Sequence, residues 1–313
     1  MILVLGALGQ LGIELTQNLR TSLGAPSVIA ADIRTPSDSF LAQGPFEKVD
    51  CCNPRDLNPL FEKYSIKQLY HLPALLSSKA EEDPVLAVDT NLMGLFQILE
   101  LARQYRCQVF YPSTIGVFSA ESPNLDTPQN CIMRPKTIYG TTKLAGELLC
   151  EYYQYKFQLD IRSIRLPGII SHKVCPQAGT TDYAVEMFYA AQKASYYTSY
   201  LEANTTLDMV YIEDAIAGIL QLMEVDLSLL KGMVYNLTAM QFSVVDLHKA
   251  LLEHYPNFKL RFSIDPIRQR IAESWPKRID DRWVREEWGW NPKYSFQEMV
   301  ETMCIHLQAK SHV

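Results

Sequence analysis

The stretch that decides the fold is the N-terminal run MILVLGALGQLG, residues 1–12. Its first residues are apolar and predict a buried strand, and residues 11–24, LGIELTQNLRTSLG, have the apolar spacing of a helix. Gly6, Gly9 and Gly12 form the pattern GxxGxxG at the junction. Such glycines let a backbone turn tightly and approach a pyrophosphate at a helix N-terminus. A signal peptide is the alternative, but no basic residues precede the apolar run, so we interpret it as a first strand.

An acidic residue follows this turn at the distance expected for a dinucleotide site. Asp32 ends the next apolar run, residues 27–34, SVIAADIR. A carboxylate there accepts hydrogen bonds from the adenosine ribose and repels a 2′-phosphate, which favours NAD over NADP. Arg34, in contrast, favours NADP over NAD. The alternative is that the glycines form only a tight turn and Asp32 only a cap.

Apolar strand patterns alternate with helical patterns through the first half of the chain. Such alternation predicts an α/β fold, a Rossmann-like doubly wound parallel sheet with helices on both faces. After Ser171 the sequence becomes polar and rich in Thr and Tyr, which predicts a smaller C-terminal α+β substrate domain. We expect an NAD-binding domain of residues 1–171 plus about 208–238, and a substrate-binding domain of about 172–207 and 239–313.

Composition narrows the function further. The net charge of −6 removes the electrostatic attraction that drives nucleic-acid binding. We expect that no apolar run reaches the ~20 residues that span a bilayer, and therefore no membrane association. The seven cysteines form no CxxC pair, and Cys51 and Cys52 are adjacent, which does not suit zinc-type spacing. We therefore expect reduced thiols, a cytoplasmic protein and no metal site.

A second motif, YxxxK, is carried by Tyr139 and Lys143 within a predicted helix over 137–157. At this spacing the two side chains lie on one helix face, about 5–6 Å apart at Cβ, and an ammonium there favours a tyrosinate. Tyr139 follows the strand end at Ser113 and Thr114, which lets a hydroxyl meet the tyrosine. The pattern alone is weak, because it recurs at Tyr152–Lys156, Tyr189–Lys193 and Tyr255–Lys259.

Together, GxxGxxG, a Ser/Thr after a central strand and YxxxK resemble the extended short-chain dehydrogenase/reductase superfamily, which includes sugar-nucleotide epimerases. The stretches PSTIGVF, TPQN, YGTTKLAGE, RLPGIIS and GTTDYAVEMF, with the Trp-rich tail, are similar to short-chain type L-threonine 3-dehydrogenases. This resemblance covers essentially the whole chain. It implies NAD-dependent oxidation of L-threonine at the Cβ hydroxyl to 2-amino-3-oxobutanoate.

The resemblance also implies roles for individual residues. Tyr139 would be the base, Thr114 would orient the hydroxyl, and Lys143 would lower the pKa of Tyr139 and bind the nicotinamide ribose. The implied cofactor-binding residues are Gly6, Gly9, Gln10, Leu11, Gly12, Asp32, Arg34, Asp50, Leu72, Pro73, Ala74, Asn91, Tyr139, Lys143 and Leu166.

The implied substrate site centres on GTTDYA, residues 179–184. Asp182 would pair with the substrate ammonium, and Trp275 would close the pocket. The alternative is that Thr180 and Asp182 only cap the following helix. The full implied set is Ser77, Thr114, Tyr139, Gly179, Thr180, Thr181, Asp182 and Trp275.

The sequence departs from the family pattern at four places: Leu166 replaces an expected Tyr, Gln177-Ala178 interrupts a glycine run, Pro73 lacks an N–H, and Thr114 replaces Ser. The departures leave the substrate detail and the mobility of a candidate lid over 172–181 open.

Two rival functions remain. A sugar-nucleotide epimerase or dehydratase would need a diphosphate clamp, yet Lys173 and Lys193 are the only basic residues between His172 and Asp208. A non-catalytic NAD(H) sensor would show cofactor binding without turnover. The resemblance further implies a homodimer formed by the two long helices that begin near Asn91 and Tyr139.

Overall fold

The computed structural model describes residues 1–174 and 179–310. Seven parallel strands form the central sheet in the order β10-β6-β5-β4-β1-β2-β3. This sheet confirms the predicted Rossmann-like α/β fold. Its strands are β1 (Ile2–Leu5), β2 (Val28–Asp32), β3 (Phe46–Lys48), β4 (Gln68–His71), β5 (Gln108–Thr114), β6 (Ile161–Leu166) and β10 (Val234–Asn236).

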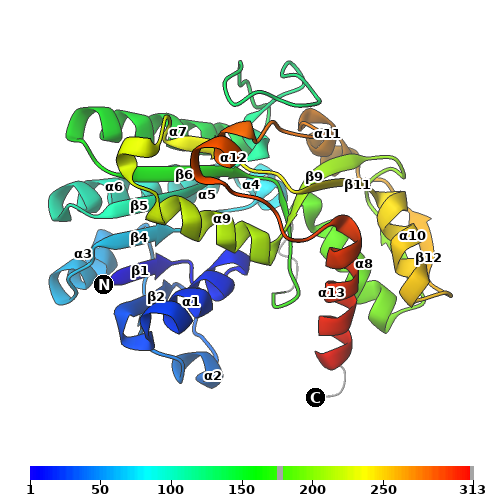
Figure 1. Cartoon of the computed structure of the whole chain (residues 1–313), viewed down its shortest axis with the longest axis horizontal. Helices are drawn as coiled ribbons and strands as arrows, with labels where there is room; N and C mark the ends of the chain where they lie inside the picture. Colours follow the sequence, from blue (N-terminus) through cyan, green and yellow to red (C-terminus); the bar gives the residue numbers. More distant parts are fainter. Residues whose placement is uncertain (175–178, 311–313) are drawn as a thin grey trace.

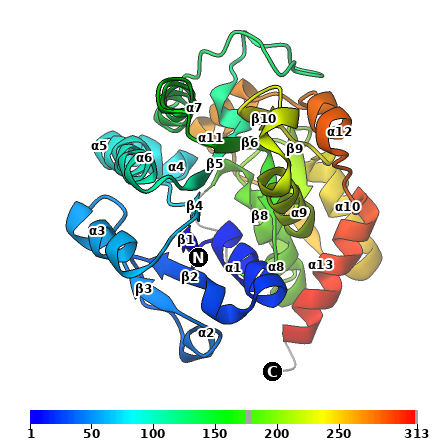
Figure 2. The same cartoon turned by 60° about the vertical axis from the view of Figure 1, so that its left-hand side comes forward.

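Helices cover both faces of this sheet, because successive strand residues point to opposite sides. In β1, Val4 packs in one core cluster with Leu15 of α1 (Gln10–Leu23) and with α9 (Ile212–Glu224). Leu3 and Leu5 pack in the other cluster, with α3 (Pro54–Lys63), α6 (Gly94–Tyr105) and α7 (Ile138–Phe157). Figure 2 shows the two groups of helices on either side of the sheet.

The strand order reverses between β1 and β4, which are neighbours. The loops that leave the carboxyl ends of these two strands therefore turn away to opposite sides. A crevice at such a point is the usual ligand site of an open parallel sheet. The first glycine turn and the loop after β4 both lie there.

Most of the remaining elements lie beside this sheet, on the right in Figure 1. Strands β7 (Gly168–Ile170), β9 (Thr206–Tyr211) and β11 (Met240–Ser243) form one small sheet, and β8 (Tyr196–Ser199) pairs with β12 (Lys259–Phe262). Strands β7 and β9 pair with each other outside the large sheet, although the predicted boundaries place them largely in the Rossmann domain. The two-domain division stays a prediction. The helices here are α8 (Tyr183–Lys193), α10 (Val244–His254), α11 (Pro266–Ser274), α12 (Arg282–Trp288) and α13 (Phe296–Lys310).

One segment differs from the expectation about apolar runs. Residues Pro84–Tyr105 comprise α5 (Pro84–Val88), the π-helical turn η2 (Asp89–Met93) and α6, and their length and composition would allow a membrane span. The expectation that no stretch reaches that length was therefore wrong. Core helices pass the same test, and here Leu95, Ile98 and Leu99 are fully buried in the core under the sheet.

Candidate active site

A cavity of about 980 Å³ lies where the carboxyl ends of the central strands meet the small sheet. It brings together residues that the sequence predicted from segments far apart in the chain. The predicted residues that line it are Gly6, Gly9, Gln10, Leu11, Gly12, Asp32, Arg34, Asp50, Leu72, Pro73, Ala74, Ser77, Thr114, Tyr139, Lys143, Leu166, Gly179, Thr180, Thr181, Asp182 and Trp275.

The glycine turn leaves space for a phosphate group. Gly6 has φ +74°, in the left-handed region that favours glycine. A Cβ on Gly12 would lie 2.1 Å from the Gly6 carbonyl oxygen, so a side chain cannot fit there. Helix α1 therefore begins close against β1, with its first N–H groups at the cavity. This cradle suits the pyrophosphate of a dinucleotide.

Asp32 is held as a carboxylate at the end of β2. Its Oδ2 accepts from the Leu8 amide at 2.9 Å, and its Oδ1 accepts from Arg34 Nε at 3.0 Å. Burial raises the pKa of Asp32, but the hydrogen bonds from Arg34 and from the amide of Leu8 outweigh burial and leave the pKa lowered. Arg34 is therefore bound to Asp32 in this structure. In the sequence, Asp32 favours NAD and Arg34 favours NADP, and their pairing accounts for this conflict.

Gln10 joins the glycine turn to the small sheet. Its Nε2 donates to the Ile169 carbonyl at 3.0 Å and to Ser171 Oγ at 2.9 Å. A residue predicted to contact the cofactor thus also fixes the strand that leads into the substrate segment.

Asn91 is the predicted site residue that does not line the cavity. Its Oδ1 accepts from the Leu75 amide at 2.7 Å, and its Nδ2 donates to the Leu75 carbonyl at 3.1 Å and to Thr142 Oγ1 at 3.1 Å. Asn91 is buried in the π-helical turn η2, an irregularity often found at functional sites. It holds the loop after β4 in place from behind; direct contact with a cofactor stays a prediction.

Helix α7 brings Tyr139 beside Thr114. The helix begins after Thr137, whose Oγ1 accepts from the Gly140 amide at 3.0 Å. A Cβ on Gly140 would lie 2.1 Å from the Gly116 carbonyl oxygen, so only glycine allows this close approach. The Thr114 hydroxyl bonds the Tyr139 hydroxyl as a result.

Burial acts on the protonation of both Tyr139 and Lys143. Burial raises the pKa of Tyr139 to about 12, although the hydrogen bond from Thr114 lowers it. Burial lowers the pKa of Lys143 to about 8, while Cys150 and Glu147 raise it. Lys143 Nζ donates to the Pro112 carbonyl at 2.9 Å. The effect of Lys143 on the pKa of Tyr139 that the resemblance implies stays a prediction.

Sequence reasoning missed a buried ion pair next to Lys143. Glu147 lies one turn after Lys143 on α7, and Arg165 Nη2 on β6 donates to Glu147 Oε2 at 2.8 Å. Ser113, which lines the cavity, donates to Glu147 Oε1. The signal available was an arginine, Arg165, within a predicted buried strand, together with an acidic residue, Glu147, one turn after Lys143 on the helix.

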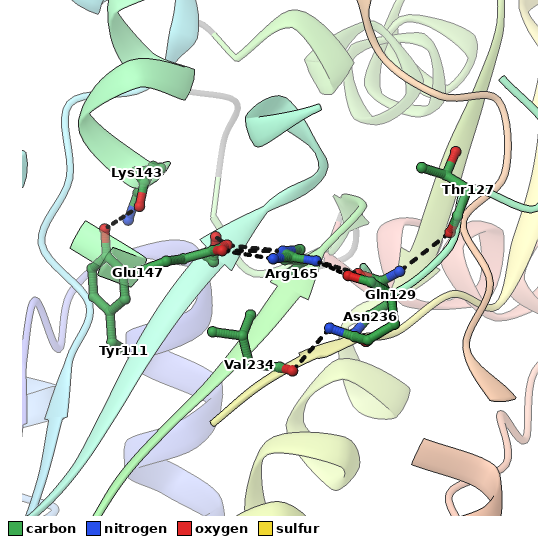
Figure 3. Close-up of polar contacts among 9 residues, drawn as sticks. Tyr111, Thr127, Gln129, Lys143, Glu147, Arg165, Val234 and Asn236 are labelled. Carbon is green, nitrogen blue, oxygen red and sulfur yellow. Dashed lines mark hydrogen bonds and ion pairs between the residues drawn. The ribbon is translucent and has the colours of Figure 1, made fainter. Parts of the chain in front are cut away.

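This ion pair continues into a longer chain of hydrogen bonds, drawn in Figure 3. Arg165 Nη1 donates to the Gln129 carbonyl at 2.7 Å, and Gln129 Nε2 donates to the Val234 carbonyl at 2.9 Å. Asn236 Nδ2 then donates to the Thr127 carbonyl at 3.3 Å. The network ties the helix that carries Tyr139 and Lys143 to β10 and to the segment before α7.

Ser77 and Thr180 meet on the wall of the same cavity. Their hydroxyl oxygens are 3.0 Å apart, and the Thr180 amide donates to Ser77 Oγ at 3.1 Å. Asp182 Oδ2 accepts from the Gly179 amide at 2.8 Å. This bond closes a capping box at the 3-10 turn Thr180–Asp182, and Asp182, the N-cap of α8, makes no side-chain capping bond to that helix. Asp182 and Thr180 both line the cavity.

Trp275 also lines the cavity. It is buried, and a Cβ on Gly116 would lie 3.4 Å from its Nε1 and 3.5 Å from Thr114 Oγ1. Within the described part of the chain, Trp275 Nε1 has no hydrogen-bond partner. An unpaired buried donor beside Thr114 can serve a polar ligand.

Some of the residues that depart from the family pattern also line the cavity. Leu166 and Pro73 line the cavity with apolar surface. Gln177 and Ala178, with much of the candidate lid, lie outside the described residues. Further lining residues that the sequence did not single out are Cys51, Cys52, Lys79, Pro167 and Val185.

The chain is similar to proteins of one family over nearly its whole length. The model of the NAD dependent epimerase/dehydratase family matches residues 2–238. A protein of Staphylococcus haemolyticus described as an uncharacterized epimerase/dehydratase is 46% identical over 311 residues, covering 99% of this chain and 98% of that protein.

Solved structures point to a particular branch. A monomeric L-threonine 3-dehydrogenase from a metagenome has a TM-score of 0.96 and 40% identity, with 99% of each chain covered. The holo form of a GalE-like L-threonine dehydrogenase from Cupriavidus necator has a TM-score of 0.94 and 38% identity, covering 98% of this chain and 99% of that one. These matches confirm the resemblance, the fold and the cofactor NAD. The chain belongs to the NAD dependent epimerase/dehydratase family.

Proposed function

We propose that this protein oxidises L-threonine at its Cβ hydroxyl to 2-amino-3-oxobutanoate with NAD. One observation carries the proposal: the hydroxyl pair Thr114–Tyr139 and the pair Ser77–Thr180 with Asp182 line one cavity. Threonine has a hydroxyl to be oxidised, which matches the base Tyr139. Its ammonium matches the carboxylate of Asp182, and its carboxylate matches the neutral donors of the Ser77–Thr180 pair.

The protein's own residues would divide the work as follows. Gly6, Gly9 and Gly12 would hold the pyrophosphate, and Asp32 the adenosine ribose; the cofactor supplies the hydride acceptor. Tyr139, once deprotonated, takes the proton of the substrate hydroxyl, and Thr114 orients that hydroxyl.

At the substrate end, Asp182 would pair with the ammonium group. The Ser77–Thr180 pair and Trp275 Nε1–H provide neutral donors for the carboxylate. Lys143, one turn after Tyr139 on the same helix face, is the cation that can stabilise a phenolate when it leaves the Pro112 carbonyl.

The second candidate is an NAD-dependent sugar-nucleotide epimerase or dehydratase. The descriptions of the curated relatives favour it. Against it, the cations among the described lining residues are Arg34, Lys79 and Lys143. Arg34 is bound to Asp32 and Lys143 is buried behind Tyr139, so the described wall has no cluster of cations for a second diphosphate.

We further propose a cytoplasmic protein that forms a homodimer. Leu148, Tyr152 and Tyr155 on α7 recur at helical spacing and are exposed, as are Met93 and Phe96 near the start of α6. Exposed apolar side chains in such a row suit a helix-to-helix contact between two copies. One similar structure is described as monomeric, so this proposal needs a direct measurement.

The function is tested by following NADH absorbance with L-threonine, L-allo-threonine, L-serine or a UDP-sugar as separate substrates. We expect turnover with L-threonine. If a UDP-sugar is converted and amino acids are not, the second candidate replaces the first. NAD binding without any turnover would favour a sensor.

A further inference from the structure

Three possible metal ligands gather on the cavity wall between β3 and α3. They are the carboxylate of Asp50 and the thiols of Cys51 and Cys52, and one ligand atom from each lies within 4.8 Å of the others. All three residues line the cavity. The two sulfur atoms are 3.9 Å apart.

This sulfur–sulfur distance matches a shared tetrahedral metal ion. With Zn–S bonds of about 2.3 Å and tetrahedral angles, two thiolates on one zinc lie about 3.8 Å apart. The observed separation therefore needs almost no rearrangement of the two side chains. Asp50 Oδ1 accepts from the Cys52 amide at 2.9 Å, which ties the carboxylate to the same dipeptide.

The surroundings favour a cation on the cavity side. Gly94, at the start of α6, closes the other side, since a Cβ there would be 3.4 Å from each sulfur. Asp50 and Asp89 both place negative charge near Cys52.

We propose that Asp50, Cys51 and Cys52 form a binding site for a soft divalent cation of the Zn²⁺ or Cd²⁺ type. On binding, both thiols release their protons, the two thiolates and the carboxylate bond the ion, and water fills the fourth position. The CxxC rule misses this site because adjacent cysteines can present two sulfurs to one ion without intervening residues.

Occupancy of this site would inhibit the enzyme. Asp50 is also a predicted cofactor-binding residue, so the cation and NAD would compete for it. This part of the inference rests on the predicted contact between Asp50 and the cofactor, whereas cation binding does not.

The test is a titration of the full chain with Cd²⁺ in oxygen-free buffer, after a thiol assay shows that the cysteines are reduced. The readout is the thiolate-to-Cd²⁺ charge-transfer absorbance, which needs no enzyme activity. We expect one ion per chain, and affinity that falls as the pH is lowered because protons compete. Cys51→Ser, Cys52→Ser and Asp50→Asn should each weaken binding roughly tenfold or more. Cys131→Ser removes another partly buried thiol away from the cavity and should leave binding unchanged.

The outcomes separate the two parts of the inference. Equal Cd²⁺ absorbance in the wild type and in the Cys51→Ser, Cys52→Ser double variant would overturn the site. Saturating NAD should raise the apparent Kd for Cd²⁺. If Cd²⁺ binds to the pair and NAD does not weaken it, the cation site stands and the predicted contact of Asp50 with the cofactor is wrong.

Discussion

Glu147 of α7 and Arg165 of β6 form an ion pair with both side chains buried, and the Arg165 Nη2 to Glu147 Oε2 distance is 2.8 Å (Figure 3). Both partners have further hydrogen bonds, from Ser113 and to Gln129. A buried pair of this kind costs more to break than it contributes when intact, because one charge is left without a partner.

We therefore expect Glu147→Gln to reduce the free energy of unfolding by about 3–5 kcal/mol. Denaturant unfolding measures this. The control is Glu121→Gln at the exposed Arg134–Glu121 pair, which should leave the free energy of unfolding nearly unchanged. Equal losses in the two variants would mean that the buried network does not stabilise the fold.

Tyr139→Phe should reduce kcat for L-threonine by about 10²–10⁴-fold, the contribution of a general base. NAD binding, measured by calorimetry, should persist because the glycine turn is untouched. Tyr152→Phe, in a second YxxxK pair on an exposed part of α7, is the matched control and should keep full activity. Comparable losses in both variants would remove Tyr139 from the mechanism.

The rate should rise with pH across the neutral range. Burial raises the pKa of Tyr139 to about 12, so the phenol is protonated at neutral pH and its ionised fraction grows about tenfold per pH unit below the pKa. We expect log kcat/KM to rise with a slope near +1 until the base is ionised. A profile that is flat between pH 6 and 8 would show that another group controls the proton transfer.

Ser77→Ala and Thr180→Val should each raise KM for L-threonine by roughly tenfold, because each leaves one polar group of the pair without its partner. The double variant should cost less than the product of the two single effects, since the residues interact. If the KM change of the double variant equals the product of the two single changes, the two hydroxyls have separate roles.

Acid should destabilise the protein through His71. Burial lowers the pKa of His71 to about 3, and its two ring nitrogens have no partner within the described residues. A depressed folded-state pKa means that stability is fully present above the unfolded value near 6.5 and is lost as pH falls towards 3, by up to about 1.4 kcal/mol per pH unit. His71→Leu should flatten this part of the Tm-against-pH curve. An unchanged slope would assign the acid sensitivity to other groups.

The homodimer should depend on the exposed face of α7. Leu148→Lys with Tyr155→Lys places two charges where the proposed contact is apolar, and should convert dimers to monomers in light scattering. A wild-type chain that is already monomeric would contradict the proposal and match the description of the metagenomic relative.

Patterns within the sequence predicted the alternation of strands and helices, the glycine turn and the YxxxK pair, whereas most other cavity residues were implied by the family resemblance. These features are local: Gly6 and Gly12 are needed within one turn, and Tyr139 and Lys143 share a face because they are one helical turn apart. Local spacing could therefore reveal them without knowledge of the packing.

Only the tertiary structure decided how these groups affect one another. Asn91 lies behind the cavity because its amide pairs with the Leu75 backbone. Lys143 is directed at the Pro112 carbonyl, and burial raises the pKa of Tyr139. Arg165 reaches Glu147 from a different strand. Burial and hydrogen-bond geometry arise from contacts between distant segments, and pattern in a single sequence does not contain them.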